Sequence, residues 1–437
     1  MSHLSLVDGP LPVAISILAA AGMLWLLAGG RRFWRLAAPL AVAGGAAGAA
    51  LLWYAAEHAY GWWDESFPRV LYVWAGATVA AVLLLAPRLT ASRGVVRRLA
   101  SILAVLLVAT GAVAQANTEY GAYPTVASMF ADQDLAAGPI TAVAGGRRNG
   151  APLPATTEAG WSPPADLPGH GSVYRVAIPG TASGYRADNA YVYLPPAYLA
   201  DPRRTNLPVL VMIHGRPGGP GSWISSGNLA QTMDDYAAEH DGLAPVVIMP
   251  DLSMGGAAAW PLCLDSQVAK SATYLAVDVP AWVRTTLGAG TAGSRQWAIG
   301  GLSSGGTCAM QLAANYPQAY PTFLDMSGEI EPAVHGGRRK LVQQYFGGSE
   351  ARFRKQNALD VLAAREFPDT AGKFVVGASD AKYGAALARV FAAAREAGMD
   401  VRLEKFPGGH SWHLWSAALP AQMPWLMQRL GVSAGDG

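Results

Sequence analysis

Four long apolar stretches occupy the first quarter of this 437-residue chain, at residues 11–28, 36–56, 70–86 and 99–114. Each is close to the roughly 20 residues that a helix needs to cross a bilayer. Only a helix or a closed barrel satisfies its backbone polar groups inside a membrane, so these stretches have few other folds open to them. The sequence therefore predicts an all-α, four-helix transmembrane domain over residues 1–114.

The basic residues of this region predict its orientation. Arginines 31, 32 and 35 lie between the first two stretches, and arginines 88, 93, 97 and 98 lie between the last two. The loop between them carries Glu57, Asp64 and Glu65 with a single arginine, Arg69. By the positive-inside rule, both basic loops are cytoplasmic and both termini are extracytoplasmic. Residues 1–10 contain no Lys or Arg, which argues against a cleaved signal peptide.

Aromatic residues gather at the outer ends of the second and third stretches. They are Trp53, Tyr54, Tyr60, Trp62, Trp63, Tyr72 and Trp74. An interfacial belt explains them most simply, and a platform for lipid headgroups is the alternative. No charged residue stands in mid-span, so transport by these helices is not indicated.

Composition changes after the fourth stretch. Residues 115–171 are rich in Ala, Gly, Thr and Pro, which predicts an extracytoplasmic linker. Residues 172–437 then alternate apolar β-prone runs with helical patterns, which predicts one α/β domain built on a doubly wound, mostly parallel sheet. Strands are expected at 173–178, 190–194, 209–213, 246–249, 296–299, 322–325, 374–376 and 401–406. Helices are expected at 228–240, 273–287, 307–315, 337–346, 352–366, 383–398 and 411–430.

Overall charge and cysteine content exclude several functions. The formal net charge is +2 and no basic patch is interleaved with aromatics, so nucleic acid is not an expected partner. Two cysteines cannot form a four-cysteine zinc site, and no metal or cofactor is expected. The oligomeric state is not indicated by the sequence.

One glycine-rich turn carries the strongest chemical signal of the α/β region. Gly301, Leu302, Ser303, Ser304 and Gly305 match the G-x-S-x-G pattern, between an apolar run and a helix-compatible segment. In that context the serine occupies a tight corner between a strand and a helix. The residues two positions before and after it must lack a Cβ atom to fit beside the corner, so both are glycine. Ser304 is excluded as the nucleophile because Leu302 stands two residues before it. Ser303 is therefore the predicted nucleophile.

A serine nucleophile needs a histidine base and an orienting acid, which follow it in α/β-hydrolases in the order Ser, acid, His. His410 follows the last expected strand, and His413 is the reserve. Asp380 ends the run 373–380 at the carboxyl end of a strand, where chemistry gathers in such sheets. Three other carboxylates, Asp325, Glu329 and Glu331, remain alternatives for the acid.

The oxyanion hole is expected at two backbone amides. The strand at 209–213 runs into His214, Gly215 and Arg216, a turn suited to presenting an N–H, and Arg216 is the predicted donor. Ser304, directly after the nucleophile, is the predicted second donor. His214 is expected to brace the turn.

Together these residues resemble the putative-esterase family of α/β-hydrolases, which includes esterase D, feruloyl esterases and mycolyltransferases. The resemblance covers about residues 172–430. It rests on 213–216 (Ile-His-Gly-Arg), 249–251 (Met-Pro-Asp), 301–305 (Gly-Leu-Ser-Ser-Gly) and 408–412 (Gly-Gly-His-Ser-Trp) with Asp380 before it. It implies acyl transfer from an ester, through a serine acyl-enzyme, to water or another hydroxyl. Relatives often have leucine where Arg216 stands, and the soluble members lack the four apolar stretches.

The two cysteines, Cys263 and Cys308, lie on segments expected to approach the rim of the site. An extracytoplasmic compartment permits their oxidation, so a disulfide between them is expected, with two buried thiols as the alternative.

Three functions follow from these features. The first is a membrane-anchored, extracytoplasmic serine esterase that acts on acyl or aminoacyl esters of lipids or envelope glycolipids, with membrane lipids as neighbours. The second is a mycolyltransferase-like acyltransferase that uses a sugar hydroxyl as acceptor. The third is a non-catalytic membrane assembly protein that retains the fold.

Overall fold

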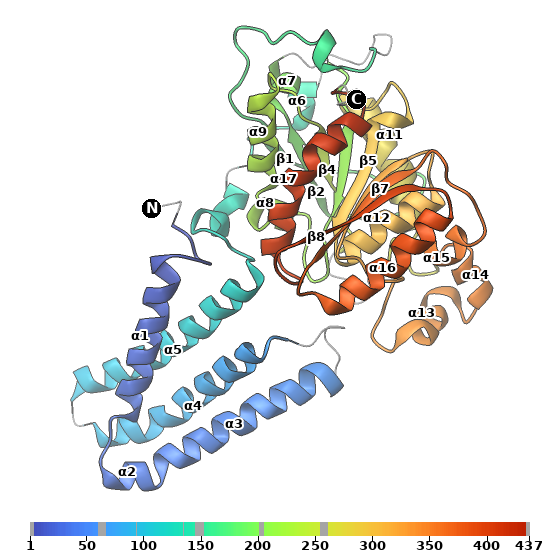
Figure 1. Cartoon of the computed structure of the whole chain (residues 1–437). Coiled ribbons are helices and arrows are strands. Elements are labelled where there is room, and N and C mark those ends of the chain that lie inside the picture. Colours follow the sequence, from blue (N-terminus) through green and yellow to red (C-terminus); the bar gives the residue numbers. More distant parts are fainter. Residues whose placement is uncertain are drawn as a thin grey trace. The chain divides into compact units, whose positions relative to one another are not determined.

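The computed structural model of the chain describes residues 4–59, 67–92, 94–133, 135–144, 153–200, 205–253 and 261–433 (Figure 1). The chain divides into two compact units, Met1–Met129 and Phe130–Gly437. Several residues with sequence-based predictions lie outside the described part: Tyr60, Trp62, Trp63, Asp64, Glu65, Arg93, residues 134 and 145–152 of the expected linker, and residues 434–437 of the expected α/β domain.

The N-terminal unit consists of four long helices, each corresponding to one apolar stretch. They are α1 (Pro10–Leu27), α3 (Ala37–Tyr54), α4 (Arg69–Ala91) and α5 (Val95–Tyr120), with the short α2 (Arg31–Arg35) between the first two. A π-helical turn, η1 (Ala55–Ala59), continues α3. Gly121 ends α5 with φ 65°, a left-handed conformation that glycine adopts without strain. Within the described residues, these four helices are long and apolar enough to cross a membrane.

Small residues let the helices of this unit pack closely. Helix α1 packs along α5, α3 along α4, and α4 along α5. A Cβ atom on Gly45 of α3 would lie 2.5 Å from the carbonyl oxygen of Gly76 on α4, so the two backbones meet there. Close approach at small residues is typical of helices that associate in lipid. Many Leu and Val side chains on the outside of the unit stay exposed.

The segment 115–171, expected to be a linker, is divided between the two units. Helix α5 extends through its first six residues to Tyr120. Later residues bond to the second unit: the Ala136 amide donates to the Val173 carbonyl at 2.8 Å, and the Trp161 indole N–H donates to the Asp241 carbonyl at 2.9 Å. These hydrogen bonds fix part of the segment onto the second unit, which its proline-rich composition does not indicate.

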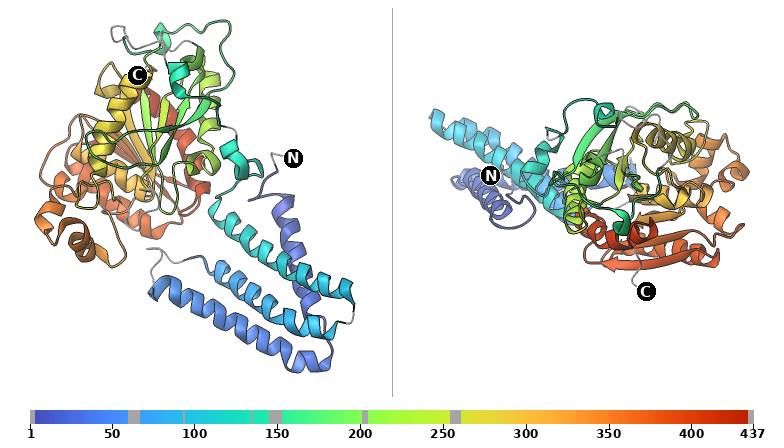
Figure 2. Two further views of the ribbon diagram at one scale, coloured as in Figure 1. Left: turned by 180° about the vertical axis from the view of Figure 1, so that it is seen from behind. Right: turned by 90° about the horizontal axis from the view of Figure 1, so that it is seen from above.

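The second unit is built on one eight-stranded sheet of order β1-β2-β4-β3-β5-β6-β7-β8. Two further views show helices packed against this sheet (Figure 2). The strands are β1 (Ser172–Ala177), β2 (Asn189–Leu194), β3 (Val209–Ile213), β4 (Val246–Met249), β5 (Trp297–Leu302), β6 (Thr322–Met326), β7 (Ala371–Gly377) and β8 (Asp400–Phe406). Strand β2 is antiparallel to β1 and β4, and all other neighbours are parallel. The predicted doubly wound, mostly parallel sheet is confirmed.

Helices from both sides bury the central strands. Two groups pack on the sheet: α9 (Leu229–Glu239) with α17 (Trp412–Arg429), and α12 (Ser304–Asn315) with α15 (Ala358–Leu362) and α16 (Ala381–Glu396). Strands β3, β4, β5 and β6 are buried at every residue, which explains their continuous apolar runs. The shorter elements are α6 (Ile140–Ala144), α7 (Pro196–Ala200), α8 (Ser222–Ser225), η2 (Ala127–Gln133), η3 (Glu158–Gly160) and η6 (Ser294–Gln296).

Two of the expected helices are irregular. The helix expected at 273–287 is a run of α10 (Ser271–Thr273), η4 (Tyr274–Asp278), α11 (Val279–Trp282) and η5 (Val283–Leu287). Pro280, which has no N–H to donate, lies in its middle. The helix expected at 352–366 is divided into α14 (Glu350–Arg354) and α15. There Gln311 and Asn315 of α12 donate to the Gln356 carbonyl at 3.0 and 2.7 Å, which draws that carbonyl out of helical bonding.

Between β6 and β7, α13 (Gly337–Phe346) and α14 form a segment with its own small core. Leu341, Tyr345 and Phe353 bury their side chains there with Leu262 and Leu264 of the loop 261–270. Arg338 packs over the Phe353 ring and pairs with Glu331 at 2.6 Å and with Glu350 at 2.7 Å. We refer to residues 337–354 as the α13–α14 segment.

Candidate active site

Ser303 lies at the corner between β5 and α12. Strand β5 continues through both glycines to Leu302, and α12 begins at Ser304, so the turn is a single residue. Ser303 has φ 53° and ψ −125°, a backbone conformation that costs a residue with a side chain of order 1–3 kcal/mol. Such strain at a serine between a strand and a helix is the geometry of a nucleophile elbow.

The two glycines of the motif are required by close backbone contacts. A Cβ on Gly301 would lie 2.3 Å from the Gly305 carbonyl oxygen, and one on Gly305 would lie 2.3 Å from the Ile213 carbonyl oxygen. Real Cβ atoms do not approach backbone oxygens so closely. The start of α12 can therefore pack against β3 and β5 only if both positions lack a side chain.

Asp380 and His410 meet beyond the ends of β7 and β8. The Asp380 Oδ2 atom lies 3.2 Å from His410 Nδ1, and these side chains are 6% and 14% exposed. The loops that carry them are bonded to each other. The Ala378 amide donates to the Phe406 carbonyl at 2.7 Å, and the Ser379 amide donates to the Gly408 carbonyl at 3.0 Å. Two residues thirty positions apart in the chain are thereby held together.

Aromatic side chains fix the orientation of the His410 ring. Tyr383 stacks on its face, with centroids 3.9 Å apart and planes 21° apart, and Trp415 meets it edge-on at 4.9 Å and 88°. The other Asp380 oxygen, Oδ1, accepts from the Tyr383 amide at 3.1 Å, which caps α16. No sequence pattern pointed to these aromatic neighbours, although Tyr383 follows Asp380 by three positions and Trp415 follows His410 by five.

Further contacts connect Ser303 with the region of His410. The Ser303 amide donates to the Met326 carbonyl at the end of β6, at 2.8 Å. The next residue, Ser327, donates its amide to the Val375 carbonyl at 2.7 Å and accepts from the Trp415 indole N–H at 3.3 Å. Because Trp415 also contacts His410, the ends of β5, β6, β7 and the start of α17 meet at one edge of the sheet.

The alternative acids lie in other surroundings. Asp325 is fully buried within β6, where its Oδ1 accepts from the Gly328 amide at 2.8 Å. Burial raises the pKa of this carboxyl to about 7, with a further increase from the charge of Glu329 and a partial decrease from the Gly328 hydrogen bond. Glu331 pairs with Arg338. His413, the reserve base, is exposed on the first turn of α17, while His410 faces Asp380.

The turn after β3 approaches the elbow closely. A Cβ on Gly215 would lie 2.5 Å from Leu302 Cδ1 and 3.4 Å from Ser303 Cβ. His214, fully buried behind this turn, has Nδ1 2.9 Å from the Gly215 carbonyl oxygen, while Nε2 lies 3.4 Å from the Leu252 amide nitrogen. Since the Leu252 amide can only donate, Nε2 accepts and Nδ1–H donates to the Gly215 carbonyl.

These two hydrogen bonds of His214 orient the peptide between Gly215 and Arg216. Burial lowers the pKa of the His214 imidazole, which favours the neutral ring that these two bonds require. The C=O of Gly215 and the N–H of Arg216 belong to one planar trans peptide and point in opposite directions. Holding the carbonyl on His214 therefore turns the Arg216 N–H away from His214. The Arg216 side chain is exposed.

Ser304 offers the second amide. As the first residue of α12, it has an N–H with no acceptor within the helix, and the helix dipole favours negative charge at this end.

Cys263 and Cys308 form a disulfide, with an S–S distance of 2.01 Å and Cα atoms 5.4 Å apart. Cys308 lies one turn into α12, so the bond attaches the loop 261–270 to the helix that begins beside Ser303. Within the described residues, no three His, Cys, Asp or Glu side chains gather closely enough to hold a metal ion.

Comparison with known proteins shows the family of the chain. The family model described as "Putative esterase" matches residues 185–426, more than half of the chain. An uncharacterized protein of Corynebacterium glutamicum is 35% identical over 391 residues, covering 87% of this chain and 86% of its own.

Solved structures are similar to part of the chain. A ferulic acid esterase superposes with a TM-score of 0.51 at 16% identity, over 60% of this chain and 99% of its own. An S-formylglutathione hydrolase from Agrobacterium tumefaciens superposes with a TM-score of 0.49 at 18% identity, over 62% and 99%. The chain belongs to the putative esterase family and is a serine ester hydrolase of α/β-hydrolase fold, with four additional N-terminal helices long and apolar enough to cross a membrane.

Proposed function

We propose that this protein is a membrane-anchored, extracytoplasmic serine esterase that uses Ser303, His410 and Asp380 as its catalytic triad. The observation that carries the proposal is the presence of a strained serine elbow and a partly buried Asp–His pair on loops at the same edge of the sheet. Strain at Ser303 has no structural use of its own. Asp380 contacts His410 at Nδ1, the ring nitrogen that an orienting acid must contact in a Ser-His-Asp triad.

In the proposed reaction, His410 Nε2 removes the hydroxyl proton of Ser303 while Oγ attacks the ester carbonyl carbon. Asp380 accepts from Nδ1–H of His410 and stabilises the imidazolium that forms. The tetrahedral intermediate then expels the alcohol, which takes the proton from Nε2, and leaves an acyl group on Ser303. Water, deprotonated by the same nitrogen, then attacks the acyl carbon of the acyl-enzyme. The second tetrahedral intermediate breaks the bond to Ser303 Oγ, which takes the proton back from His410 Nε2, and the carboxylic acid leaves.

The negative oxygen of each tetrahedral intermediate needs two donors, and we assign them to the Arg216 and Ser304 amides. The close approach of Gly215 to Ser303 supports the first assignment, because it brings the peptide between residues 215 and 216 beside the nucleophile. His214 supports it further by holding the carbonyl of that peptide on the opposite side. The position of Ser304 at the start of α12 supports the second.

The N-terminal helices support an envelope substrate. With both arginine-rich loops in the cytoplasm, the catalytic unit lies outside the cell, tethered to the outer face of the bilayer. The substrates within reach there are acyl or aminoacyl esters of lipids or of envelope glycolipids.

A short-chain chromogenic ester tests the activity on the full chain in detergent. The wild type is expected to hydrolyse the ester, and Ser303→Ala is expected to leave no turnover above background. Adding a sugar acceptor distinguishes esterase from acyltransferase: an esterase releases free acid at an unchanged rate, whereas an acyltransferase forms acyl sugar. Equal turnover by folded Ser303→Ala would contradict the assignment of the nucleophile.

A further inference from the structure

Ser327, the residue directly after β6, has a backbone conformation that serine rarely adopts. Its φ is 57°, in the left-handed region where a Cβ atom is crowded and glycine is favoured. Among the residues that the structure describes, those with a positive φ that are not glycine are Asn228, Asp241, Leu262, Cys263, Ser303 and Ser327. Asparagine and aspartate tolerate this region, Leu262 and Cys263 lie at the disulfide, and Ser303 is the elbow. The strain at Ser327 therefore requires an explanation of its own.

Hydrogen bonds to β7 and to α12 fix the turn that carries Ser327. The Ser327 amide donates to the Val375 carbonyl of β7 at 2.7 Å. Two residues later, the Glu329 amide donates to the Thr307 hydroxyl at 2.8 Å, and that hydroxyl donates to the Ser303 carbonyl at 3.3 Å. The Ser303 amide in turn donates to the last carbonyl of β6 at 2.8 Å. The turn is thus bonded directly to the proposed nucleophile.

The Ser327 hydroxyl connects this turn with the helix that follows the proposed base. It accepts from the Trp415 indole N–H at 3.3 Å. Trp415 lies on the first turn of α17 and meets the His410 ring edge-on, with centroids 4.9 Å apart and planes 88° apart. The Tyr383 ring stacks on the His410 ring as well. Because the hydroxyl holds the indole, it also limits how far the imidazole can tilt.

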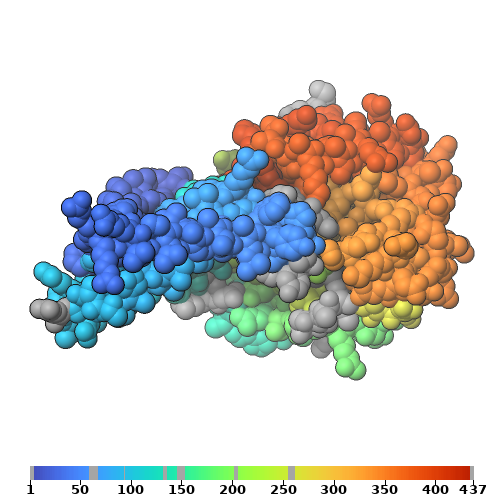
Figure 3. All heavy atoms as spheres, turned by 90° about the horizontal axis from the view of Figure 1, so that it is seen from below, coloured from blue at the N-terminus to red at the C-terminus, as the bar shows by residue number. Residues whose placement is uncertain are grey.

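Solvent does not replace the hydroxyl in this contact. Ser327 is 0% exposed and Trp415 is 6% exposed. On the face drawn in Figure 3, the part of the chain after β6, coloured orange to red, forms a continuous surface. A buried indole N–H that loses its acceptor stays unpaired, which costs more than the hydrogen bond contributes. Without the hydroxyl, Trp415 would move toward another acceptor, and the His410 ring beside it would lose its orientation.

We propose that Ser327 is a positioning residue for acyl transfer, which sets the plane of the His410 ring relative to Ser303 by holding Trp415. The inference rests on the proposed function, because it assigns the placement of the proposed base. Strands β6 and β7 separate β5, which leads to the nucleophile, from β8, which leads to the base. The Ser327–Trp415 bond spans this separation. Strain at Ser327 is then tolerated because a hydroxyl is needed at a position where only glycine fits without strain.

Ser327→Gly tests this role with the least disturbance, because it removes the hydroxyl and relieves the backbone strain together. In the full chain in detergent it is expected to lower kcat for a short-chain chromogenic ester about tenfold, the effect of one neutral hydrogen bond. KM should change little, since Ser327 is fully buried. Trp415→Phe keeps a ring beside His410 and removes the indole N–H, so its kcat should fall at least as far.

The double variant of Ser327→Gly and Trp415→Phe shows whether the two residues act as one unit. Its kcat is expected to equal that of Trp415→Phe alone, because both substitutions remove the same hydrogen bond. A double variant whose loss is the product of the two single losses would overturn the inference. Wild-type kcat in Ser327→Gly would overturn it as well.

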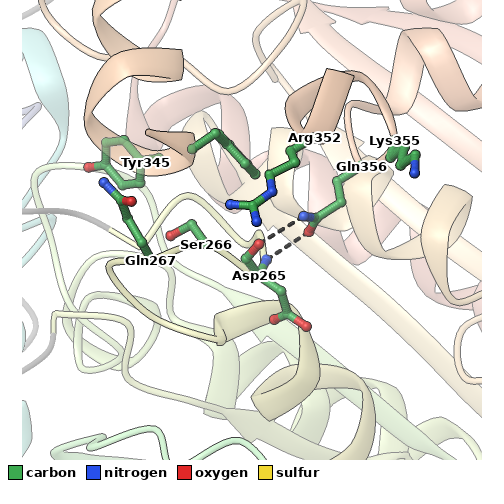
Figure 4. Close-up of a pocket in the computed structure, with 8 residues that line it drawn as sticks. Asp265, Ser266, Gln267, Tyr345, Arg352, Lys355 and Gln356 are labelled. Carbon is green, nitrogen blue, oxygen red and sulfur yellow. Dashed lines mark hydrogen bonds between the residues drawn. The ribbon is translucent and has the colours of Figure 1, made fainter. Parts of the chain in front are cut away.

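Two control variants separate this effect from strain relief and from a general loss of hydrogen bonds. Asp241→Gly relieves the same kind of strain, at φ 53° on an exposed turn. Gln356→Ala removes two bonds of 2.8 Å to the backbone of Asp265, drawn in Figure 4 beside a pocket that none of the proposed catalytic residues lines. Both controls are expected to keep the wild-type kcat. A tenfold loss in either would overturn the inference, because kcat would then respond to changes anywhere in the unit.

A second measurement reports on the His410 ring without ester turnover. In NMR spectra of the full chain isotope-labelled at histidine Cε1, the His410 signal is identified by its absence from His410→Gln. The Tyr383 and Trp415 rings shift this signal, because their ring currents act on the proton that Cε1 carries. In Ser327→Gly the signal is expected to move as Trp415 leaves its place, and in Asp241→Gly it should stay. An unchanged signal in Ser327→Gly would overturn the inference.

The two measurements distinguish failure of this inference from failure of the proposed function. Turnover that is lost in Ser303→Ala but kept in full by Ser327→Gly would refute the inference alone. Turnover that persists in folded Ser303→Ala, together with a His410 signal that moves in Ser327→Gly, would refute the proposed function. The link between Ser327 and His410 would then still stand.

Discussion

Replacing Asp325 with asparagine should change how the stability of the protein depends on pH. Asp325 is fully buried beside the elbow, and its Oδ2 atom has no hydrogen-bond partner among the described residues. Cβ atoms on Gly306 and on Gly328 would each lie 2.3 Å from its Oδ1, so backbone surrounds the carboxyl closely. An ionised carboxylate is poorly solvated in this position, which is why the pKa is raised from 3.8 to about 7.

The sign and size of the effect follow from proton binding. In the unfolded chain Asp325 loses its proton near pH 4, while in the folded chain it keeps the proton up to about pH 7. Between these values the folded state binds more protons at Asp325, so the contribution of this group to the free energy of unfolding falls as pH rises and levels off above about pH 7. About three pKa units at roughly 1.4 kcal/mol each give a loss of about 4 kcal/mol. Asparagine resembles the protonated carboxyl and does not ionise, so the variant does not lose stability in this way as pH rises.

The assay is thermal or denaturant unfolding of the full chain in detergent, for wild type and Asp325→Asn, at intervals from pH 4 to pH 8. Other titrating groups contribute equally to both proteins, so the difference between them isolates Asp325. The variant should gain stability relative to wild type as pH rises to 7, by several degrees in Tm for a unit of this size. A difference that stays constant with pH, or that favours wild type increasingly, would refute the reasoning.

Three other substitutions follow from the site. Asp380→Asn should lower kcat by about 10³–10⁴-fold, because asparagine cannot stabilise the His410 imidazolium. Folding should be little affected, since asparagine can still cap α16 at the Tyr383 amide. A kcat within tenfold of wild type would argue for another acid. His214→Leu should lower kcat about 100-fold with little change in KM, since the Arg216 amide loses its orientation, and His214→Asn should restore part of the rate. Equal rates for the two variants would contradict the hydrogen-bonding role. The double substitution Cys263→Ser and Cys308→Ser removes a disulfide that closes a loop of 45 residues. It should lower the free energy of unfolding, measured by denaturant titration, by about 3–4 kcal/mol. An unchanged denaturation midpoint would contradict this expectation.

Much of the catalytic unit follows from local sequence patterns. All eight strands appear where continuous or alternating apolar runs predict them, because buried parallel strands leave little choice of residue. The elbow is also visible in the sequence, since the close contacts of Gly301 and Gly305 exclude any other residue. Both the Ser303 corner and the expected cysteine pairing have counterparts in the structure.

Features that depend on distant partners were not predictable. The break between α14 and α15 results from α12 side chains that bond to the Gln356 carbonyl, and no local propensity records this. The segment 115–171 has a linker composition, yet part of it is bonded to the second unit. The stacking of Tyr383 and Trp415 on His410 likewise arises only when the loops after β7 and β8 are brought together.

The nucleophile itself is tested most directly by covalent labelling. Purified full-length protein in detergent would be treated with a fluorophosphonate probe, digested, and the modified residue identified by mass spectrometry, with Ser303→Ala and Ser304→Ala as paired controls. Labelling of Ser303 in wild type and in Ser304→Ala, with none in Ser303→Ala, is the expected result. Folded wild-type protein that stays unlabelled, or that carries the probe on Ser304, would contradict the account.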